Sequence, residues 1–316
     1  MQGQRITVFG GSGFVGRYVV KRLAAAGALV RVPVRHVEGA KFLKLMGNVG
    51  QVSPVWMNFS NEASVRAAVV GSDAVINAVG ILSEGYGQNF GLAHVDGPAV
   101  IAEAAAQNGV QQFVHLSAIG ADAESKSQYA MSKAMGEAAT RAAFPATTIL
   151  RPSVVFGQED DFFNRFAGMA RTAPVLPLVD GGKTKFQPVY VGDVADAIIA
   201  ALHTDTAAGL TYELGGPDVM TFREIIEYIM EETGRRRPLV SAPSRFLRPL
   251  AGLLEKLPAS PLTRDQLILL QSDNVVTDGA AGLTDLGVSP TAINAIAPAY
   301  LMRYRDGGQF ARKTAI

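Results

Sequence analysis

The sequence has no cysteine, a single tryptophan and only four histidines among its 316 residues. Without cysteine the chain forms no disulfide bond and offers no thiol nucleophile and no thiolate ligand for zinc or an iron–sulfur cluster. None of the histidines pairs with an acidic residue at a separation typical of a metal site, so we predict no metal. The absence of cysteine also fits a reducing compartment. The histidines are His36, His94, His115 and His203.

A large net charge and long apolar stretches are lacking too. Lysine and arginine total 29 against 28 aspartate and glutamate, a net charge of +1, so we expect no nucleic-acid partner. No stretch approaches the roughly 18–20 consecutive apolar residues of a membrane-spanning helix. A strand-like stretch begins at Arg5, which leaves no room for a secretory signal before it. These absences predict a protein that starts in the cytoplasm and contacts any membrane only peripherally.

The composition is typical of a globular protein with a large core, because apolar residues make up 48% of the chain and charged residues 18%. Up to Pro152, short apolar stretches alternate with longer ones of helical periodicity. The former are residues 5–10, 29–35, 51–57, 73–79, 112–117 and 147–152, and the latter are Phe14–Ala26, Glu62–Val70, Asp96–Asn108 and Gln128–Ala143. This alternation predicts an α/β fold with a doubly wound parallel sheet of the Rossmann type.

Beyond Pro152 the pattern is looser, with loops rich in glycine and proline. A strand at 186–191, a helix at Val194–His203 and a strand at 210–216 come before a last hundred residues that are mostly helical. We therefore predict a Rossmann domain over residues 1–155, completed by about 186–215. The remaining residues of 156–316 should form a smaller, mostly helical C-terminal lobe interleaved with it.

A glycine-rich stretch, VFGGSGFVG, lies between the first predicted strand and the first predicted helix. In a dinucleotide-binding fold, Gly10 would allow the tight turn, Gly13 would let backbone N–H groups approach a pyrophosphate, and Gly16 would let the helix pack closely on the strand. Because the triplet has the required context, we predict a cofactor site here. Its predicted residues are Gly10, Ser12, Gly13, Phe14, Val15 and Gly16.

The end of the second predicted strand indicates which nicotinamide cofactor binds. An acidic residue about 20 positions after the glycines is typical of NAD, whereas an arginine accommodates the 2′-phosphate of NADP. Here the strand ends in Arg35 and His36, and the first acid, Glu38, comes later. The pattern favours NADP(H), unless Arg35 is an ordinary solvated charge at a strand end.

A third segment of the predicted site follows the fourth strand, in the stretch INAVGIL. Ala78, Val79 and Gly80 lie at the carboxyl end of this strand, where open α/β sheets bind ligands. Small residues there leave space for a flat cofactor. A sharp turn from strand to loop explains the same residues equally well.

Tyr129 and Lys133 lie one turn apart on one face of the predicted helix Gln128–Ala143. A neighbouring ammonium and a cationic nicotinamide ring would favour the phenolate of Tyr129, whose phenol ordinarily titrates near 10. The pair could then exchange a proton with a substrate hydroxyl or carbonyl, and Lys133 could also hydrogen-bond the nicotinamide ribose.

The segments VFGGSGFVG, INAVG, QFVHLSAIGAD, QYAMSK, ILRPSVVFG and QPVYVGDVADAI occur in an order that resembles the extended and atypical short-chain dehydrogenase/reductase superfamily. The resemblance implies that Tyr129 and Lys133 occupy the catalytic positions and that Pro152 borders the nicotinamide. It also implies that Asp193 opens a helix near the far strand, where we expect a helix N-cap.

The chain departs from the superfamily at one catalytic position. Members usually carry a serine or threonine at the strand end before the tyrosine helix, and the best alignment puts Ala118 there. Ser117, one residue earlier, would point to the opposite side of a continuing strand. Without that hydroxyl, a developing oxyanion would lose a hydrogen bond worth about 2–4 kcal/mol. Ser117 thus stays a candidate both for catalysis and for contact with the cofactor.

A narrower resemblance fits this departure. The stretches INAVGIL, SKSQYAMSKAMGEAATRAAFP, RPSVVFGQEDDFFNRFA and LTRDQ are similar to the nucleotide-binding accessory subunits of respiratory complex I, the NADH–ubiquinone oxidoreductase. The resemblance implies a reductase-like domain that holds NADPH outside the path of electron flow and supports assembly and stability. It implies contact with core subunits of the peripheral arm near the quinone site. The location would be the cytoplasmic face of a bacterial inner membrane or the mitochondrial matrix side.

The segment Arg245–Leu257 combines apolar residues near helical spacing with Arg245, Arg248 and Lys256. A basic amphipathic stretch can lie on an anionic membrane surface. It can also pack against its own lobe, which is the commoner outcome for an apolar stripe. The complex I resemblance favours an intermolecular surface.

Three functions remain open from the sequence. The first is a non-catalytic NADPH-binding accessory subunit of complex I. The second is a soluble NADP-dependent reductase or sugar-nucleotide-type epimerase that uses Tyr129 and Lys133. The third is a regulator that binds its partners according to its NADP load.

Overall fold

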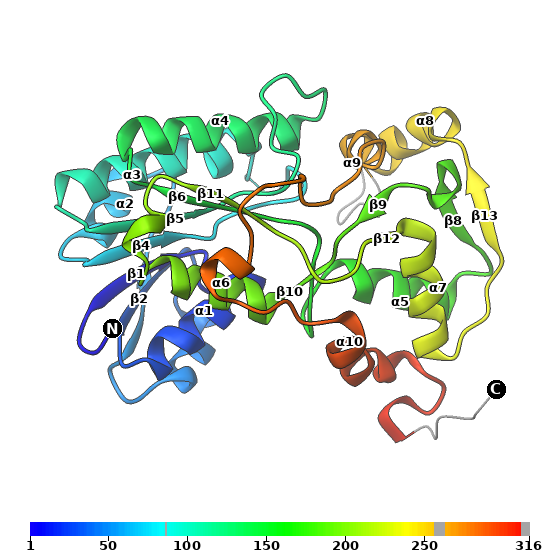
Figure 1. The fold of residues 1–316 in the computed structure, drawn as a ribbon, viewed down its shortest axis with the longest axis horizontal. Helices are drawn as coiled ribbons and strands as arrows, with labels where there is room; N and C mark the ends of the chain where they lie inside the picture. Colours follow the sequence, from blue (N-terminus) through cyan, green and yellow to red (C-terminus); the bar gives the residue numbers. More distant parts are fainter. Residues whose placement is uncertain (86, 256–262, 311–316) are drawn as a thin grey trace. The chain divides into compact units, whose positions relative to one another are not determined.

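The computed structural model describes residues 1–85, 87–255 and 263–310, and its backbone forms two compact units (Figure 1). Unit 1 consists of Met1–Pro152, Val191–Leu214 and Thr277–Ser289, and unit 2 of Ser153–Tyr190, Gly215–Val276 and the described residues from Pro290 onward.

A seven-stranded sheet forms the centre of unit 1, in the order β11-β6-β5-β4-β1-β2-β3. Every neighbouring pair is parallel, which confirms the predicted doubly wound sheet. The strands are β1 (Arg5–Phe9), β2 (Leu29–Val34), β3 (Val52–Trp56), β4 (Ala74–Asn77), β5 (Gln112–Leu116), β6 (Thr148–Pro152) and β11 (Thr211–Leu214).

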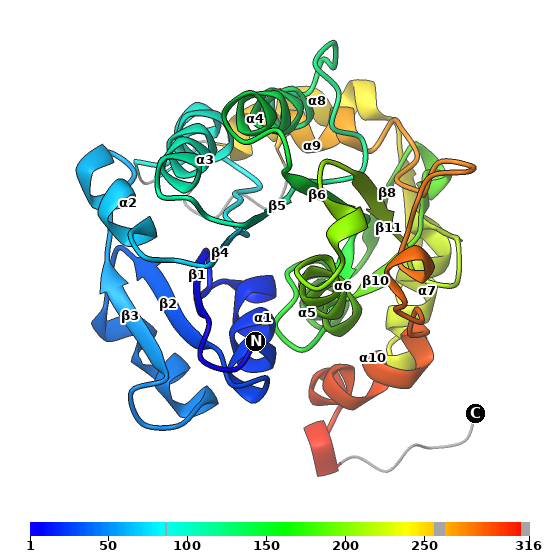
Figure 2. The ribbon, with the colours of Figure 1, turned by 60° about the vertical axis from the view of Figure 1, so that its left-hand side comes forward.

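Helices cover both faces of this sheet. On one face α1 (Phe14–Ala25) packs against α6 (Val191–Ala201), and on the other α2 (Glu62–Val69), α3 (Gly97–Gln107) and α4 (Gln128–Ala143) form a layer (Figures 1 and 2). Irregular helices η1 (Glu38–Met46) and η2 (Gly91–Asp96) precede β3 and α3, and η2 is a π-helix. Parallel strands need crossover connections, which these helices provide. Because the helices bury both faces of the sheet, β4 is buried throughout and is apolar up to its last residue, Asn77.

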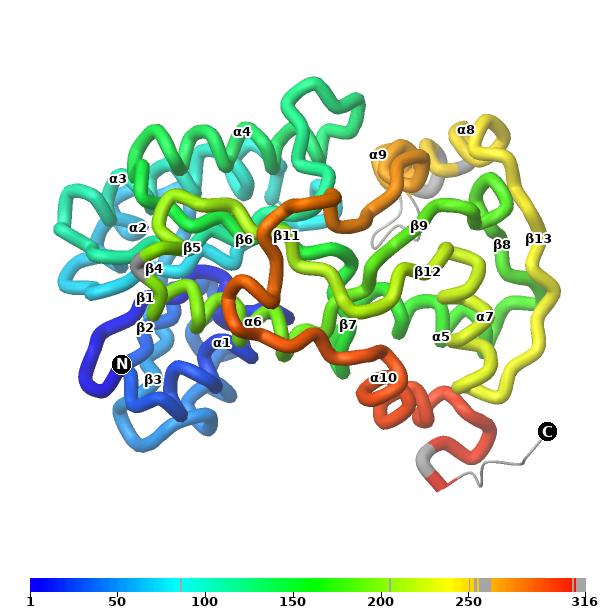
Figure 3. Tube along the Cα trace, viewed as in Figure 1, coloured from blue at the N-terminus to red at the C-terminus, as the bar shows by residue number. Residues whose placement is uncertain are grey.

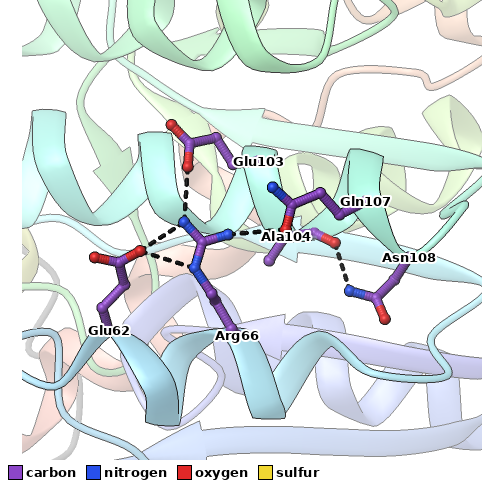
Figure 4. Close-up of polar contacts among 6 residues, drawn as sticks. All are labelled: Glu62, Arg66, Glu103, Ala104, Gln107 and Asn108. Atoms are coloured by element: carbon purple, nitrogen blue, oxygen red, sulfur yellow. Dashed lines mark hydrogen bonds and ion pairs between the residues drawn. The ribbon is translucent and has the colours of Figure 1, made fainter.

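The core beneath α2 and α3 contains large side chains from neighbouring strands, including Phe9, Val75 and Phe113. Each is at most 1% exposed, and burying a side chain of this kind contributes roughly 1.5–3 kcal/mol. On the outer surface of the same layer, Arg66 joins the two helices (Figure 4). Its guanidinium donates to Glu62 on α2 and, at 2.8 Å, to Glu103 on α3. This ion pair is exposed, so the core determines the packing.

Two late segments of the chain return to unit 1. The segment Thr277–Ser289, orange in Figure 3, lies beside β11, where Glu213 N–H donates to the Ala281 carbonyl at 2.8 Å. It contains the short helix η5 (Thr284–Leu286), which contacts α6. Helix α6 begins at Val191, so Asp193 lies inside the first turn and is not the N-cap that the sequence predicts. A carboxylate in a first turn is still favourable for the helix dipole.

Unit 2 is built mainly from helices α5 (Phe162–Thr172), α7 (Phe222–Thr233), α8 (Ser244–Leu254), α9 (Arg264–Leu269) and α10 (Ile293–Leu301). Short strands pair as β7 (Val155–Phe156) with β10 (Val189–Tyr190), β8 (Leu176–Val179) with β13 (Leu239–Ala242), and β9 (Lys185–Phe186) with β12 (Met220–Thr221). The predicted strand 186–191 is wrong as one element, because Gln187 and Pro188 interrupt it and its two halves join different sheets. Among the described residues no helix is both long and apolar enough to cross a membrane.

The stretch GQEDDFFNRF has a structural role in unit 2. The carboxylate of Asp160 accepts hydrogen bonds from the N–H groups of Gly157, Phe163 and Asn164 and from the hydroxyl of Tyr300 on α10. Burial raises the pKa of Asp160, because a desolvated carboxylate is less stable than the neutral acid. This one side chain therefore joins the start of α5 to a helix 140 residues later in the chain.

Candidate nucleotide-binding site

The candidate site lies at the carboxyl ends of the strands of unit 1. The strand order reverses between β1 and β4, which pair side by side although β2 and β3 lie between them in sequence. In open α/β sheets ligands bind at such a switch point. Gly10 follows β1 and Ala78 follows β4, so the topology brings two of the predicted segments together.

The glycine turn has the geometry that the sequence predicts. Gly10 has φ +75°, and a Cβ placed on it would lie 2.6 Å from the Ala78 carbonyl oxygen. A Cβ on Gly16 would lie 2.1 Å from the Gly10 carbonyl oxygen. Gly13 is the N-cap of α1 and has no side chain to cap its N–H groups. Phe14 and Val15 begin α1, so this helix presents open N–H groups suited to a phosphate.

A cavity of about 500 Å³ lies beside this turn, within the usual range for ligand sites. Five predicted residues line it, namely Gly10, Ser12, Arg35, His36 and Val79. The other lining residues are not among the predicted ones, and apart from Arg17 they lack a distinctive local pattern. They are Arg17, Pro33, Val34, Gly39, Ala40, Phe42, Met57, Asn58, Phe59, Ser60, Gly87, Gln88, Asn89, Leu92 and Ala93.

The cavity has a basic lining. It includes Arg17, Arg35 and His36, and no aspartate or glutamate is among its lining residues in the described part of the chain. Arg35 lies just after β2. When the Gln88 amide is oriented with its oxygen towards Arg35, that oxygen accepts from both terminal guanidinium nitrogens, at 3.2 and 3.3 Å. Glu38 forms an ion pair with Lys41 and does not line the cavity. This electrostatic arrangement suits an anionic ligand.

Arg17 shows how the turn and the cavity wall are joined. Its guanidinium donates to the carbonyl oxygens of Gly13 and Ser12 at 3.2 and 3.3 Å. It also lies 5.3 Å from the ring centre of Phe42 on η1, a cation–π distance. Sequence reasoning could have found it, because it directly follows the last glycine of the turn.

Ser117 and Ala118 follow the end of β5 at Leu116. Ser117 is buried, its N–H donates to the Leu150 carbonyl at 2.7 Å, and its hydroxyl has no hydrogen-bond partner within the described residues. Ala118 is partly exposed. The adjacent strand end, Pro152, is buried and its carbonyl accepts from Ile119 N–H at 3.0 Å. The hydroxyl of Ser117 is thus turned into the interior.

Tyr129 and Lys133 lie on α4, which runs over Gln128–Ala143 as the sequence predicts. Neither lines the 500 Å³ cavity. Lys133 is 3% exposed and its ammonium donates to the Leu116 carbonyl at 2.8 Å. Burial lowers the pKa of Lys133 to about 8 and raises that of Tyr129 to about 12. The direction for Tyr129 is opposite to the sequence expectation, because burial disfavours the phenolate.

His94, which the sequence analysis considered only as a metal ligand, holds this region together. Its Nε2 accepts from Ile81 N–H at 3.0 Å, so Nδ1 carries the proton and donates to the Ser132 hydroxyl at 2.9 Å. Ser132 in turn donates to the Tyr129 carbonyl at 2.8 Å. The rings of His94 and Phe90 both lie edge-on to Tyr129, at 5.5 and 6.1 Å. Burial lowers the pKa of His94 to about 3.

A second buried histidine lies under the strand ends. Asn77 uses its oxygen to accept from Val79 N–H at 3.2 Å, so its amide nitrogen donates to His115 Nδ1 at 3.1 Å. His115 Nε2 then carries the proton and has no partner within the described residues. Burial, with a smaller effect from Lys133, lowers the pKa of His115 well below its usual value. Both histidines are neutral imidazoles at physiological pH.

Other sequence-predicted features lie elsewhere. Gly80 is exposed at the end of β4. Helix α8 covers most of the predicted segment Arg245–Leu257, whose last two residues lie outside the described residues. Leu247 and Ala251 pack against Val179 and Leu267 of their own unit, whereas Phe246 is 64% exposed under the Arg245 guanidinium. Over residues 1–85, 87–255 and 263–310, no group of three or more histidine, aspartate or glutamate side chains is placed to hold a metal ion.

The chain has relatives among known proteins. The model of the NAD dependent epimerase/dehydratase family matches residues 6–215. The mitochondrial NADH dehydrogenase (ubiquinone) 1 alpha subcomplex subunit 9 of Arabidopsis thaliana is 38% identical over 315 residues, covering 96% of this chain and 78% of the relative. The mitochondrial NADH–ubiquinone oxidoreductase 40 kDa subunit of Neurospora crassa is 35% identical over 309 residues, covering 98% and 81%.

Among solved structures, that of gox2253 resembles this chain with a TM-score of 0.74 at 18% identity, covering 96% of this chain and 99% of the other. At this level of identity the likeness concerns the fold alone.

Proposed function

The chain belongs to the NAD dependent epimerase/dehydratase family and to the family of the complex I subunits compared above, and from this premise we propose that it is a nucleotide-binding accessory subunit of complex I. The observation that carries the proposal is the 38% identity to such a subunit over 96% of this chain. In this role the protein contacts core subunits of the peripheral arm near the quinone site and supports assembly and stability.

The proposed cofactor is NADPH. The family is NAD dependent by description. The glycines of the turn leave no side chain between its backbone and a pyrophosphate, so the two can approach closely. The cavity beside it has Arg17, Arg35 and His36 in its lining and no acidic lining residue among those described. These cations favour a 2′-phosphate, since an acid would be needed to hold two ribose hydroxyls instead.

The acid–base groups support a cofactor that is held rather than turned over. The pKa of Tyr129 is raised to about 12 and that of His94 lowered to about 3, so neither exchanges protons readily near neutral pH. Ala118 brings no hydroxyl to the position that the superfamily uses for oxyanion stabilisation, and the Ser117 hydroxyl is turned into the interior.

The proposed location is peripheral, on the cytoplasmic face of a bacterial inner membrane or on the matrix side of a mitochondrial one. The Arabidopsis and Neurospora relatives are mitochondrial proteins by name. Helix α8 supports a membrane-facing role, because Arg245, Phe246 and Arg248 form a basic and apolar surface whose Phe246 is 64% exposed.

Purification of the native protein in mild detergent tests this proposal. We expect it to migrate with a large membrane complex that has NADH–quinone reductase activity. Denaturation of the isolated subunit should release about one molecule of NADPH per subunit. A protein that migrates alone from a membrane in which complex I is intact would contradict the accessory role. Release of NAD(H) would contradict the cofactor while leaving that role standing.

A soluble NADP-dependent reductase or epimerase is the second candidate, because Tyr129 and Lys133 keep the helical spacing of a working pair. This candidate predicts turnover of a carbonyl or sugar-nucleotide substrate that disappears in Tyr129→Phe, which removes the proton-carrying hydroxyl and keeps the ring. The accessory role predicts instead that Tyr129→Phe keeps its NADPH and its place in the complex.

A further inference from the structure

Glu137 lies on α4 one turn beyond Lys133 and is 5% exposed. A buried carboxylate is expensive unless a partner compensates its charge. Here Arg151 on β6 provides two parallel bonds, from Nε to Oε1 at 2.8 Å and from Nη2 to Oε2 at 2.6 Å. These two charge-assisted hydrogen bonds hold the Glu137 carboxylate in place.

Arg151 is itself held from a second side. Its Nη1 lies 3.8 Å from Oε1 of Glu213 on β11. The other carboxylate oxygen of Glu213 accepts from the N–H of Thr277 at 2.8 Å. The guanidinium is therefore fixed between two carboxylates, and it raises the cost of moving the Glu137 side chain.

Lys133 is the group that this fixed charge acts upon. The two side chains are four residues apart on α4, so they lie on one face of the helix. Burial lowers the pKa of Lys133 to about 8, and Glu137 opposes that shift. The other titratable groups around Lys133 are Tyr129 on α4, His94 on η2 and His115 on β5, and all three are neutral near pH 7.

We propose that Glu137 is a positioning residue for the nucleotide, since its clamped negative charge keeps Lys133 an ammonium ion where the nicotinamide half of the cofactor would lie. The inference rests on the proposed function, because it needs a bound nucleotide whose ribose accepts from Lys133. Arg151 prevents the carboxylate from turning to a direct contact elsewhere. The charge of Lys133 thus depends on side chains from three elements, namely Glu137 on α4, Arg151 on β6 and Glu213 on β11.

The test is the affinity for NADPH as a function of pH between 7 and 10, where the cofactor phosphates no longer titrate. In the wild-type protein the affinity should be constant at the low end and fall as pH rises through the pKa of Lys133. In Glu137→Gln the midpoint of that fall should move down by about one pH unit, so that the affinity already falls from the low end of the range; this shift is typical of losing a nearby opposite charge. At pH 8 this corresponds to a loss of affinity of up to about tenfold.

Three variants make the result specific. Lys133→Met should abolish the fall between pH 7 and 10 with or without Glu137→Gln. Glu62→Gln removes a carboxylate that also pairs with an arginine, Arg66, on the surface of the same unit (Figure 4), and it should leave the midpoint unchanged. Glu137→Gln/Arg151→Gln removes both charges of the pair together, which avoids leaving either one unpaired, and its midpoint should also move down.

The outcomes separate the two proposals. A midpoint that is the same in wild type, Glu137→Gln and the double variant would overturn the inference while NADPH binding stands. A fall that persists in Lys133→Met would also overturn it, because another group would then be titrating. Failure of the wild-type protein to bind NADPH would overturn the proposed cofactor and, with it, this inference.

Discussion

Replacing Asp160 by asparagine should destabilise unit 2, because an amide cannot satisfy all four donors that the carboxylate satisfies. One oxygen accepts from Phe163 N–H at 2.6 Å and Asn164 N–H at 3.2 Å, and the other from Gly157 N–H at 3.1 Å and Tyr300 Oη–H at 2.8 Å. An amide NH₂ group in the second position would face two donors. The tyrosine hydroxyl can turn and accept, whereas the backbone N–H cannot.

The expected loss follows from that one orphaned group. A buried donor without a partner costs about 1–3 kcal/mol. Burial raises the pKa of Asp160, so the wild-type carboxylate already carries a desolvation cost that the amide lacks, and we expect a loss near 1 kcal/mol at neutral pH. Tyr300→Phe, which removes a hydrogen bond to a charged group, should cost about 1.5–3 kcal/mol. The double variant should cost less than the sum, because both changes remove the same bond.

The pH dependence has a definite sign. The folded-state pKa of Asp160 is higher than its unfolded value. The group therefore stabilises the fold most when it is protonated, and that contribution declines as pH rises from the ordinary carboxyl pKa, near 4, to the raised one. Asp160→Asn lacks this titration. The stability difference between wild type and variant should be largest near pH 4 and should narrow towards neutral pH.

Urea unfolding followed by far-ultraviolet circular dichroism, at pH 4 and pH 7, measures these differences. Fluorescence of Trp56, the single tryptophan and a residue of β3, reports on unit 1 in the same samples. Asp161→Asn is the matched control, because Asp161 is exposed and its pair with Arg165 lies on the surface of α5, where such pairs contribute little. If Asp160→Asn and Asp161→Asn were equally stable, the four-donor geometry would be refuted.

Three further outcomes are expected. Arg35→Ala should weaken NADPH binding about tenfold or more while NADH binding changes little, since hydrogen bonds to charged groups contribute roughly 1.5–3 kcal/mol; titration with both nucleotides measures it. Gly16→Ala should abolish nucleotide binding, because the new Cβ would lie 2.1 Å from the Gly10 carbonyl oxygen. The control Gly168→Ala, in α5, places its Cβ where no atom lies within 4 Å, and it should raise the melting temperature. Phe246→Ser should reduce sedimentation with vesicles that contain anionic lipids, and unchanged sedimentation would contradict a membrane role for α8.

Much of unit 1 could be predicted because its elements follow local rules. The predicted bounds of α4 are those observed, since Ser127 caps the helix by accepting from Ala130 N–H at 3.2 Å. The seven parallel strands follow from apolar stretches separated by helical ones. The glycine turn was predictable for the same reason, as all its residues are neighbours in sequence.

The features that sequence reasoning missed depend on contacts between distant residues. Tyr300 meets Asp160 across 140 positions, and no periodicity marks the return of Thr277–Ser289 to unit 1. His94 matters through Ile81 and Ser132, which lie 13 and 38 positions away. The strand predicted at 186–191 failed because local propensity does not show that two sheets share it. Pairing with distant strands decides such cases, and neighbouring residues in a single sequence do not reveal it.

The acid–base groups near Tyr129 explain why a dyad can persist without a reaction. Proton transfer near neutral pH works best when the pKa of the donor lies near the working pH, and that of Tyr129 is raised to about 12. Lowering it to about 8 would require roughly 5 kcal/mol of differential interaction, with no hydroxyl at position 118 to share the charge that develops. Lys133, whose ammonium donates to the Leu116 carbonyl, can hold a ribose without that cost. Under the proposed function, cofactor binding alone would explain why the pair is retained.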